Sequence, residues 1–171
     1  MLLLPAAASA APVTVEAESL ATGSGGTFAD TGASSDRALR IWSNGAATGT
    51  LQSRATRRIS VRARAESCDG APRMVVSVAG KVVLEQTVSA SAWTEYAADV
   101  SLTDGAHALE IRFTNDFNRT GCDRNLLLDR VLATSVAIKR PGESDGTCNG
   151  GPSAGTFWPE YALGLASRAT G

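Results

Sequence analysis

The segment Phe113–Asp129, FTNDFNRTGCDRNLLLD, decides the fold, because it joins two apolar runs through a long polar loop. Alternating apolar and polar residues lead up to Phe113, and the apolar run Leu126–Leu128 follows the loop directly. A β-hairpin turns in about two to five residues. This loop is longer and is rich in carboxylate and amide oxygens. The segment therefore predicts two strands joined by a specialised loop.

The rest of the chain repeats the pattern of short strands. Arg57–Glu66, RRISVRARAE, alternates over its whole length, and its residues Ile59, Val61, Ala63 and Ala65 are predicted to face inward. Ala79-Gly80 lies between two further runs, Met74–Val78 and Lys81–Val88, and predicts a hairpin turn. The other predicted strands are Val13–Glu18, Ala38–Trp42, Trp93–Leu102, His107–Phe113 and Asn125–Val136. About nine short strands without a long helical period predict an all-β fold, an antiparallel β-sandwich of the jelly-roll type.

The composition and the two ends of the chain suggest one exported domain. With 171 residues, of which 43% are hydrophobic, the chain has material for a single core. Residues 1–12, MLLLPAAASAAP, resemble the end of a secretory signal, so we expect a secreted protein. Residues 13–137 form the predicted sandwich, and residues 138–171 form a Gly/Pro-rich linker and a tail of unknown role. These features suggest a monomeric module within a larger chain.

The charge distribution argues against two classes of partner. The formal net charge is −1, which gives no electrostatic reason to expect nucleic acid or an anionic membrane. No run approaches the ~20 apolar residues of a membrane span. Arg58, Arg62 and Arg64 fall on one face of a predicted strand, and we interpret them as a solvated face.

Export permits disulfides, and the chain has three cysteines, of which only one pair can form. We favour Cys68–Cys122, because both residues lie in polar loops flanked by strong strands. Pairing that involves Cys148, and three free thiols, are the alternatives that the sequence leaves open.

The polar loop is a candidate metal site. Calcium takes about six to eight oxygen ligands, mixing carboxylates, backbone carbonyls and water. Asp116, Asn118 and Asp123 supply side-chain oxygens from this one loop, although their spacing is not that of an EF-hand. The alternatives are a solvated polar loop, or ion pairs in which Arg119 or Arg124 neutralises the aspartates.

A second acidic group involves the first and last predicted strands. A period of two puts Glu16 and Glu18 on one face, where they repel each other unless a cation or an arginine lies between them. Asp129 is predicted to share a buried face with Leu127 and Val131, and a buried carboxylate needs a partner. If the first and last strands pair, three carboxylates converge there and favour a structural calcium ion. A solvent-facing pair of glutamates is the alternative.

Catalytic interpretations find little support. His107 is the only histidine and has no nucleophile motif beside it, and there is no His/Cys cluster for zinc. Asp116 and Asp123 could form the carboxylate pair of a glycoside hydrolase, but such enzymes usually carry far more aromatic and acidic residues. We therefore predict a binding protein and not an enzyme.

Aromatic residues make up only 5% of the chain. Four of them lie in strand-like stretches and are expected in the core: Trp42, Trp93, Tyr96 and Phe113. Phe117 lies in the acidic loop and is expected to border a ligand. A binding protein without an aromatic platform must gain affinity elsewhere, and a metal ion with open coordination positions is one source.

Four motifs carry a resemblance to a known family. They are Val15-Glu-Ala-Glu18, ISVRARAESCDGAP at 59–72, the Trp93-x-x-Tyr96 strand, and FTNDF…CDRNLLLDRV at 113–131. Together they resemble the calcium-dependent xylan-binding modules, families thirty-six and sixty of the carbohydrate-binding modules, over nearly the whole predicted sandwich. The resemblance implies a non-catalytic jelly roll in which calcium bridges the protein and two neighbouring sugar hydroxyls. The implied partner is xylan or a similar polysaccharide.

The resemblance also implies roles for single residues. It places the ligand-binding calcium at Asp116, Asp123 and the carbonyl of Cys122. It places a structural calcium at Glu16, Glu18 and Asp129, with loop carbonyls near Ser35–Arg37. It implies Asp69 as a hydrogen-bonding contact to the sugar, and Phe117 and Asn118 are expected beside it. The alternative function is a structural or adhesive sandwich stiffened by calcium and appended to a larger secreted protein.

Overall fold

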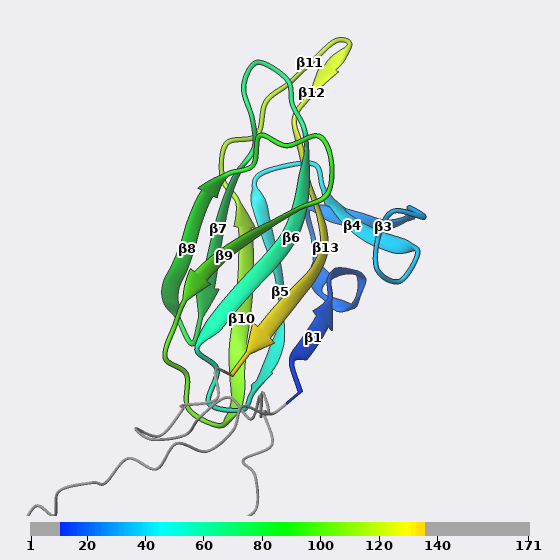
Figure 1. Ribbon diagram of the computed structural model, residues 1–171. Coiled ribbons are helices and arrows are strands. Elements are labelled where there is room, and N and C mark those ends of the chain that lie inside the picture. The colour runs from blue at the N-terminus through cyan, green and yellow to red at the C-terminus, as the bar shows by residue number, and fades with distance from the viewer. Residues whose placement is uncertain (1–10, 136–171) are drawn as a thin grey trace, which may run out of the picture. The chain divides into compact units, whose positions relative to one another are not determined.

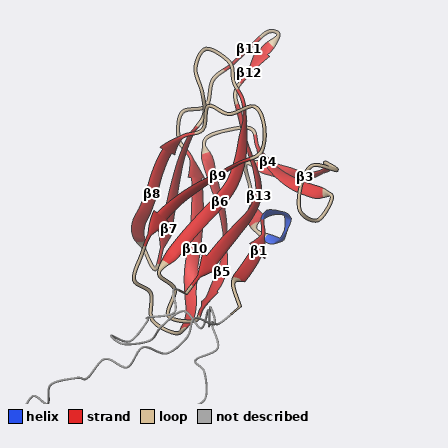
Figure 2. Cartoon of the chain, in the orientation of Figure 1, coloured by secondary structure: helices blue, strands red, loops and turns tan. Residues whose placement is uncertain are grey.

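The computed structural model describes residues 11–135, which form two facing antiparallel sheets (Figure 1). The strands are β1 (Val13–Glu16), β2 (Ala21–Thr22), β3 (Gly25–Ala29), β4 (Arg37–Ile41), β5 (Gly45–Ser53), β6 (Arg58–Glu66), β7 (Arg73–Val78), β8 (Lys81–Thr87), β9 (Thr94–Asp99), β10 (Gly105–Phe113), β11 (Asn118–Arg119), β12 (Cys122–Asp123) and β13 (Asn125–Thr134). The short 3-10 turn η1 (Ala17–Ser19) is the one helical element within these residues (Figure 2). The predicted all-β fold is confirmed.

The sheet topology makes β13 the central strand of one layer. The six-stranded sheet has the order β3-β4-β13-β6-β9, with β1 also paired to β13, and the five-stranded sheet has the order β2-β5-β10-β7-β8. Along one edge of β13, β4 pairs with Leu126–Leu128 and β1 pairs with the residues from Arg130 to Ala133. The first and last strands therefore do pair, which is the condition set above for bringing Glu16, Glu18 and Asp129 together.

The core lies between the two sheets and follows the period-two pattern of the sequence. Along β6, Ile59, Val61, Ala63 and Ala65 are buried, as predicted, while the residues between them are partly exposed. Opposite them, Leu109, Ile111 and Phe113 of β10 are buried in the same hydrophobic cluster. Complete burial of side chains of this size stabilises the fold by about 1.5–3 kcal/mol each.

The hairpin between β7 and β8 has the turn that the sequence predicts. Ala79 and Gly80 connect the strands with φ angles of 50° and 75°. A two-residue turn of type I′ requires positive φ at both positions, because its twist then matches that of the flanking strands.

A β-bulge in β13 changes the face on which Asp129 lies. The register of β13 against β6 shifts between Leu128 and Arg130, so Asp129 is the extra residue. Leu128 and Val131 both belong to the core cluster, three positions apart, whereas an unbroken strand would place them on opposite faces. Asp129 is fully buried, as predicted, but the prediction that it shares a face with Val131 is wrong.

Two further predictions about side-chain placement are wrong. Strand β1 ends at Glu16, and Glu18 lies in η1, so the two glutamates are not neighbours on one strand face. Trp42 follows the end of β4 and is exposed. Of the other tryptophan and tyrosine expected in the core, Tyr96 packs against the core cluster, whereas Trp93 lies outside it, in contact with Arg62 and Arg64.

The chain divides into two compact units, Met1–Ile138 and Lys139–Gly171. The signal remnant up to residue 10, the linker and tail beyond residue 135, and Cys148 lie outside the described residues, so these predictions stay predictions. Within residues 11–135, no helix is long and apolar enough to cross a membrane.

Candidate functional site

The acidic loop leaves β10 at Phe113 and returns to β13 at Asn125. It contains the small hairpin β11–β12, which stands at one end of the sandwich (Figure 1). The disulfide Cys68–Cys122 joins this hairpin to the connection between β6 and β7, with a Cα–Cα distance of 5.5 Å. The favoured cysteine pair is therefore confirmed, and it ties together two loops that are 54 residues apart in the sequence.

The two loop aspartates are held by amide groups and not by arginines. The side-chain amide of Asn118 donates to Asp123 Oδ1 at 2.8 Å, and that of Asn125 donates to Asp123 Oδ2 at 3.1 Å. The backbone N–H of Asp116 donates to Asn44 Oδ1 at 2.8 Å, whereas Asp116 Oδ1 is buried and has no hydrogen-bond partner within the described range. In residues 11–135 neither aspartate forms a salt bridge. Two carboxylates without a counter-charge fit a site for a cation.

Arg124 is buried between the loop after β6 and the acidic loop, and within residues 11–135 its side-chain hydrogen bonds all go to backbone carbonyls. Its guanidinium donates to the carbonyls of Cys68 at 2.8 Å and 3.0 Å, Gly70 at 3.1 Å and Asn115 at 2.6 Å, and also to that of Asp69. These acceptors come from two loops, the one after β6 and the one after β10. Within residues 11–135, Arg124 therefore forms no ion pair with Asp116 or Asp123, which was one alternative that the sequence left open. Its hydrogen bonds instead hold the two loops together.

Phe117 and Asp69 lie at the same end of the sandwich. The Phe117 ring has the guanidinium carbons of Arg119 and Arg124 at 5.7 Å and 5.5 Å from its centroid, within the range of cation–π contact. Asp69 is exposed and adopts a positive φ of 48° beside the disulfide. Phe117 therefore lies within the acidic loop, and Asp69 lies in the loop that the disulfide joins to it. Contact of either residue with a ligand stays a prediction.

Asn125 and Glu66 extend this site beyond the predicted residues. Asn125 is buried, and its amide donates both to Asp123 and, at 2.8 Å, to Glu66 Oε2. Glu66 Oε1 in turn pairs with Arg40 at 2.6 Å. Asn125 and Glu66 were not predicted as site residues, because they become neighbours only through the pairing of β13 with β6.

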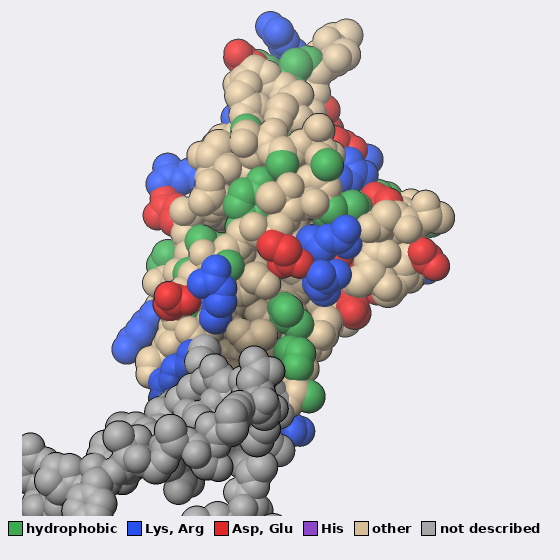
Figure 3. All heavy atoms as spheres, viewed as in Figure 1, with side chains coloured by type: hydrophobic (Ala, Val, Ile, Leu, Met, Phe, Trp, Pro, Cys, Tyr) green, Lys and Arg blue, Asp and Glu red, His purple; other side chains and the backbone are tan. Residues whose placement is uncertain are grey.

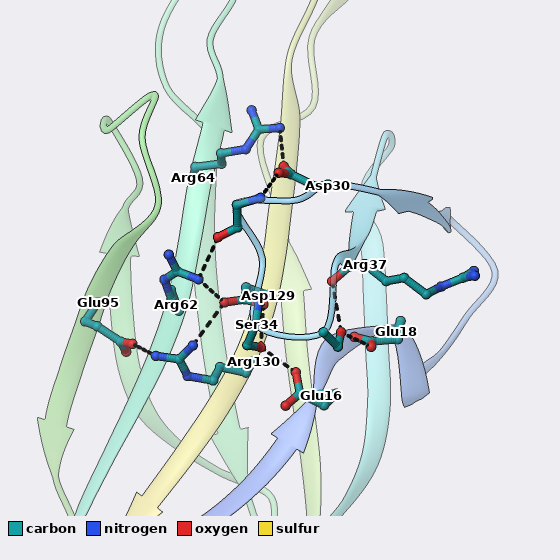
Figure 4. Close-up of polar contacts among 12 residues, drawn as sticks. Glu16, Glu18, Asp30, Ser34, Arg37, Arg62, Arg64, Glu95, Asp129 and Arg130 are labelled. Atoms are coloured by element: carbon teal, nitrogen blue, oxygen red, sulfur yellow. Dashed lines mark hydrogen bonds and ion pairs between the residues drawn. The ribbon is translucent and has the colours of Figure 1, made fainter.

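The second acidic group is connected by serines of the loop between β3 and β4 (Figure 4). The Ser34 hydroxyl lies 2.7 Å from Glu16 Oε2 and 2.8 Å from Asp129 Oδ1, and the Ser35 hydroxyl donates to Glu18 Oε1. A single hydroxyl proton serves one carboxylate at a time. Glu18 Oε2 is buried and has no hydrogen-bond partner among the residues that the structure describes.

Asp129 already has positive partners. Its Oδ2 lies 2.5 Å from Arg62 Nη1 and 3.3 Å from Arg130 Nη1, and the Ser34 N–H donates to its Oδ1 at 2.8 Å. Burial raises the pKa of Asp129, but the hydrogen bonds from Ser34 and Arg62 outweigh it and hold that pKa below its ordinary value. Within residues 11–135, no three His, Cys, Asp or Glu side chains gather closely enough to hold a metal alone. A cation here would need carbonyl or water oxygens, as calcium commonly does.

The arginine row on β6 is more than a solvated face. Arg64 pairs with Asp30 at 3.0 Å, and the guanidinium carbons of Arg62 and Arg64 lie 5.6 Å and 5.1 Å from the centroid of the Trp93 ring. The Gly32 N–H and the Arg64 guanidinium hold the pKa of Asp30 below its ordinary value. Figure 3 shows acidic and basic side chains lying next to each other on this face of the six-stranded sheet. The interpretation of a solvated face holds for Arg58, which pairs with the exposed Asp99, but is wrong for Arg62 and Arg64.

Solved structures share this fold. A CBM36 module in complex with calcium and xylotriose has a TM-score of 0.56 at 15% identity, covering 71% of this chain and 99% of that one. The CBM36-1 domain of a multidomain xylanase from the hindgut metagenome of Trinervitermes trinervoides has a TM-score of 0.58 at 16% identity, covering 75% and 100%. The Podospora anserina GH26-CBM35 β-(1,4)-mannanase has a TM-score of 0.58 at 22% identity, covering 76% of this chain and 29% of that one. These likenesses establish the β-sandwich.

Sequence comparisons identify the family. Endoglucanase A of Cellulomonas fimi is 62% identical over 32 residues, which are 19% of this chain and only 7% of that protein's length. The family model of CBM60, described as a calcium-dependent, xylan-binding carbohydrate-binding module, matches residues 58–145, just over half of the chain. The match includes the disulfide and the whole acidic loop, and the predicted resemblance and the non-catalytic character are confirmed. The chain belongs to the family of calcium-dependent, xylan-binding carbohydrate-binding modules.

Proposed function

We propose that the acidic loop of this module binds one calcium ion through the carboxylates of Asp116 and Asp123 and the carbonyl of Cys122. The observation that carries the proposal is the buried Asp116 Oδ1: among residues 11–135 it has no hydrogen-bond partner, and neither loop carboxylate has a counter-charge there. Leaving such an oxygen unpaired costs about 1–3 kcal/mol, which a bound cation would recover.

We propose that the ligand is xylan or a related plant-wall polysaccharide. A calcium ion with open coordination positions accepts two neighbouring hydroxyls in place of two waters. Asp69, Phe117 and Asn118 lie around the loop and are the proposed contacts to the sugar beside the ion. Binding at one such site is weak, with Kd on the order of 0.1–1 mM.

The proposed biological setting is a secreted, multi-module polysaccharide-degrading protein in which this module is monomeric. The short match to an endoglucanase supports a partner domain of that kind. In such a protein, weak binding at each module is raised by avidity.

We further propose a second, structural calcium ion at Glu16 and Glu18, with Asp129 at its margin. Two observations support the position: Glu18 Oε2 is buried without a partner in the described part of the chain, and a single Ser34 hydroxyl lies between Glu16 and Asp129. Isothermal titration of the metal-free chain with calcium is expected to give two ions per chain, and one ion for Glu18→Gln with xylan binding retained. Binding of a single calcium ion per unaltered chain would contradict the proposal of a second, structural site.

The proposed ligand site is tested by affinity gel electrophoresis in soluble xylan, with calcium or with EDTA. Retention is expected in calcium and is expected to vanish with EDTA or with Asp123→Ala. Asp104→Ala, which removes an exposed aspartate of the turn before β10, is the matched control and should be retained normally. Retention that persists in EDTA would overturn the proposal.

The rival function, a sandwich that calcium only stiffens, predicts a different pair of results. Chelation would lower the Tm, and xylan would not retard the chain in either state. Thermal unfolding run beside the gels separates the two functions.

A further inference from the structure

The proposed calcium ligand Asp123 stands on a small hairpin and not on the sandwich itself. Strand β12 consists of Cys122 and Asp123 alone, and Asp123 is exposed to solvent. Its Oδ1 accepts a hydrogen bond from Asn118, which lies directly opposite it on β11 and belongs to the same hairpin. This contact fixes the carboxylate relative to the hairpin but not relative to the sheets.

Asn125 supplies the contact to the sheets. It is the first residue of β13, in the six-stranded sheet, and it is buried. Its amide nitrogen donates to Asp123 Oδ2 at 3.1 Å and to Glu66 Oε2 at 2.8 Å. An amide nitrogen carries two hydrogens, so the two carboxylates use both of them and determine how the amide is oriented.

Glu66 holds this amide from the neighbouring strand. It is the last residue of β6 and lies directly opposite Asn125 in the register of β6 and β13. The pairing of these two strands runs on to Arg58 and Thr134, so the backbones of both residues are fixed by the sheet. Two hydrogen bonds, from Asn125 to Asp123 and from Asn125 to Glu66, therefore connect the exposed hairpin to the end of the paired sheet.

Charge separates the role of Glu66 from that of a calcium ligand. Glu66 Oε1 pairs with Arg40 Nη2 at 2.6 Å, and Glu66 Oε2 accepts from Asn125. Asp123 has no such counter-charge within residues 11–135. Of the two carboxylates on the Asn125 amide, Asp123 is therefore left to attract a cation, whereas the neutralised Glu66 holds the amide.

We propose that Glu66 is a positioning residue for the calcium site, acting on Asp123 through Asn125. The inference rests on the proposed function and deepens it. A carboxylate that is held in place before the ion arrives loses less side-chain freedom when the ion binds. Loss of a hydrogen-bonding partner behind a metal ligand typically weakens metal binding about 10–100-fold.

This role is separate from that of the disulfide. Cys68–Cys122 joins the hairpin to the connection between β6 and β7, so it ties one loop to another. The contact between Asn125 and Glu66 instead ties the metal-binding carboxylate to the sheet. Because the side chains of Arg40 and Glu66 are 40% and 32% exposed, their ion pair adds little to stability. Loss of Glu66 is therefore expected to change calcium affinity more than stability.

The test is isothermal titration with calcium of the full 171-residue chain carrying Glu18→Gln, so that the proposed structural ion does not contribute. Adding Glu66→Ala to this parent is expected to weaken calcium binding about ten-fold. Glu66→Gln should stay within about three-fold of the parent, because its amide oxygen still accepts from Asn125. Glu85→Ala, which removes an exposed ion pair with Arg73 on the other sheet, is the matched control and should bind as the parent does.

Two further measurements separate positioning from other roles. If Glu66 acts only through Asn125, the double variant Glu66→Ala/Asn125→Ala should bind calcium no more weakly than Asn125→Ala alone. The Tm in EDTA should be the same for Glu66→Ala and the parent, because positioning changes the affinity for the ion and not the metal-free fold.

Equal calcium affinity in Glu66→Ala and the parent would overturn the positioning role and leave the calcium site standing. Equal weakening by Glu66→Ala and Glu66→Gln would also overturn it, because the charge of Glu66 and not its hydrogen bond would then act on the ion. Weaker binding by the double variant than by Asn125→Ala, or a lower Tm of Glu66→Ala in EDTA, would have the same consequence. Absence of calcium binding in the unaltered chain would instead overturn the proposed function.

Discussion

Arg62 Nη1 lies 2.5 Å from Asp129 Oδ2, so the guanidinium on β6 forms a salt bridge with a fully buried carboxylate in the bulge of β13. A bulge adds a residue and aims its side chain away from the regular pattern. Here it turns Asp129 out of the hydrophobic core and toward Ser34, Arg62 and Arg130. The pair links two strands that are far apart in the sequence.

Removing Arg62 should destabilise the fold strongly. Arg62→Met leaves Asp129 buried with weaker compensation, and the expected loss in the free energy of unfolding is about 3 kcal/mol, measured by urea titration. Arg58→Met is the matched control, because Arg58 and Asp99 are 53% and 83% exposed, and it should change stability by about 0.5 kcal/mol or less. Equal effects of the two substitutions would contradict this assignment.

Stability should fall in acid. The pKa values of Asp30 and Asp129 lie below the ordinary 3.8 in the folded protein. As the pH falls through 3.8, the unfolded chain binds protons at these groups before the folded chain does, so folding becomes less favourable. The stabilisation that ionised Asp30 and Asp129 give to the folded protein is complete above pH 3.8. It is lost as the pH drops through the lower pKa values that these groups have in the folded protein.

Urea unfolding at a series of pH values from neutral to strongly acidic checks this dependence. Asp129→Asn should unfold at lower urea concentration at neutral pH and show a shallower decline in acid. A folded state whose stability did not change below the ordinary aspartate pKa would refute it.

Arg124 should control calcium affinity by positioning the loops. Arg124→Met removes the hydrogen bonds to carbonyls of both loops and is expected to weaken calcium binding about ten-fold. Arg124→Lys should bind calcium about as weakly as Arg124→Met, because an ammonium group cannot reproduce the planar fork of hydrogen-bond donors of a guanidinium.

A control separates this role from a general loss of stability. Ile59→Val removes a methylene from the core and costs about 1 kcal/mol, but it should leave calcium affinity unchanged. Measuring Kd for calcium and Tm on all three variants decides the matter: a Kd that follows Tm alone would contradict a positioning role.

Loss of the disulfide should lower both stability and calcium affinity. The chain-entropy model gives about 4 kcal/mol for a loop of this length. Replacing Cys68 and Cys122 together by serine also frees the loop whose carbonyls bind Arg124. Urea unfolding and calcium titration of the double variant measure the two effects, and unchanged values in both would show that the crosslink is dispensable.

The sequence alone determined most of the long strands, the inward face of β6 and the β7–β8 turn, but it missed β3 and the nine-residue β5 and left the pairing of β1 with β13 as a condition. It also located the acidic loop and the favoured disulfide. These features depend on contacts between near neighbours, on the period of two, or on pairs of residues whose chemistry leaves few choices. Where the pattern held without interruption, as along Ile59 to Ala65, prediction and structure agree.

The tertiary structure decided what depends on register and on irregular backbone. The bulge at Asp129 reversed the expected relation to Val131, and the end of β1 separated Glu16 from Glu18. The exposure of Trp42 likewise became visible only once β4 was placed against β13. One inserted residue, or the end of a strand, moves a side chain to the opposite face of a sheet. The free energy that stabilises the new position comes from residues distant in the sequence, such as Arg62 for Asp129.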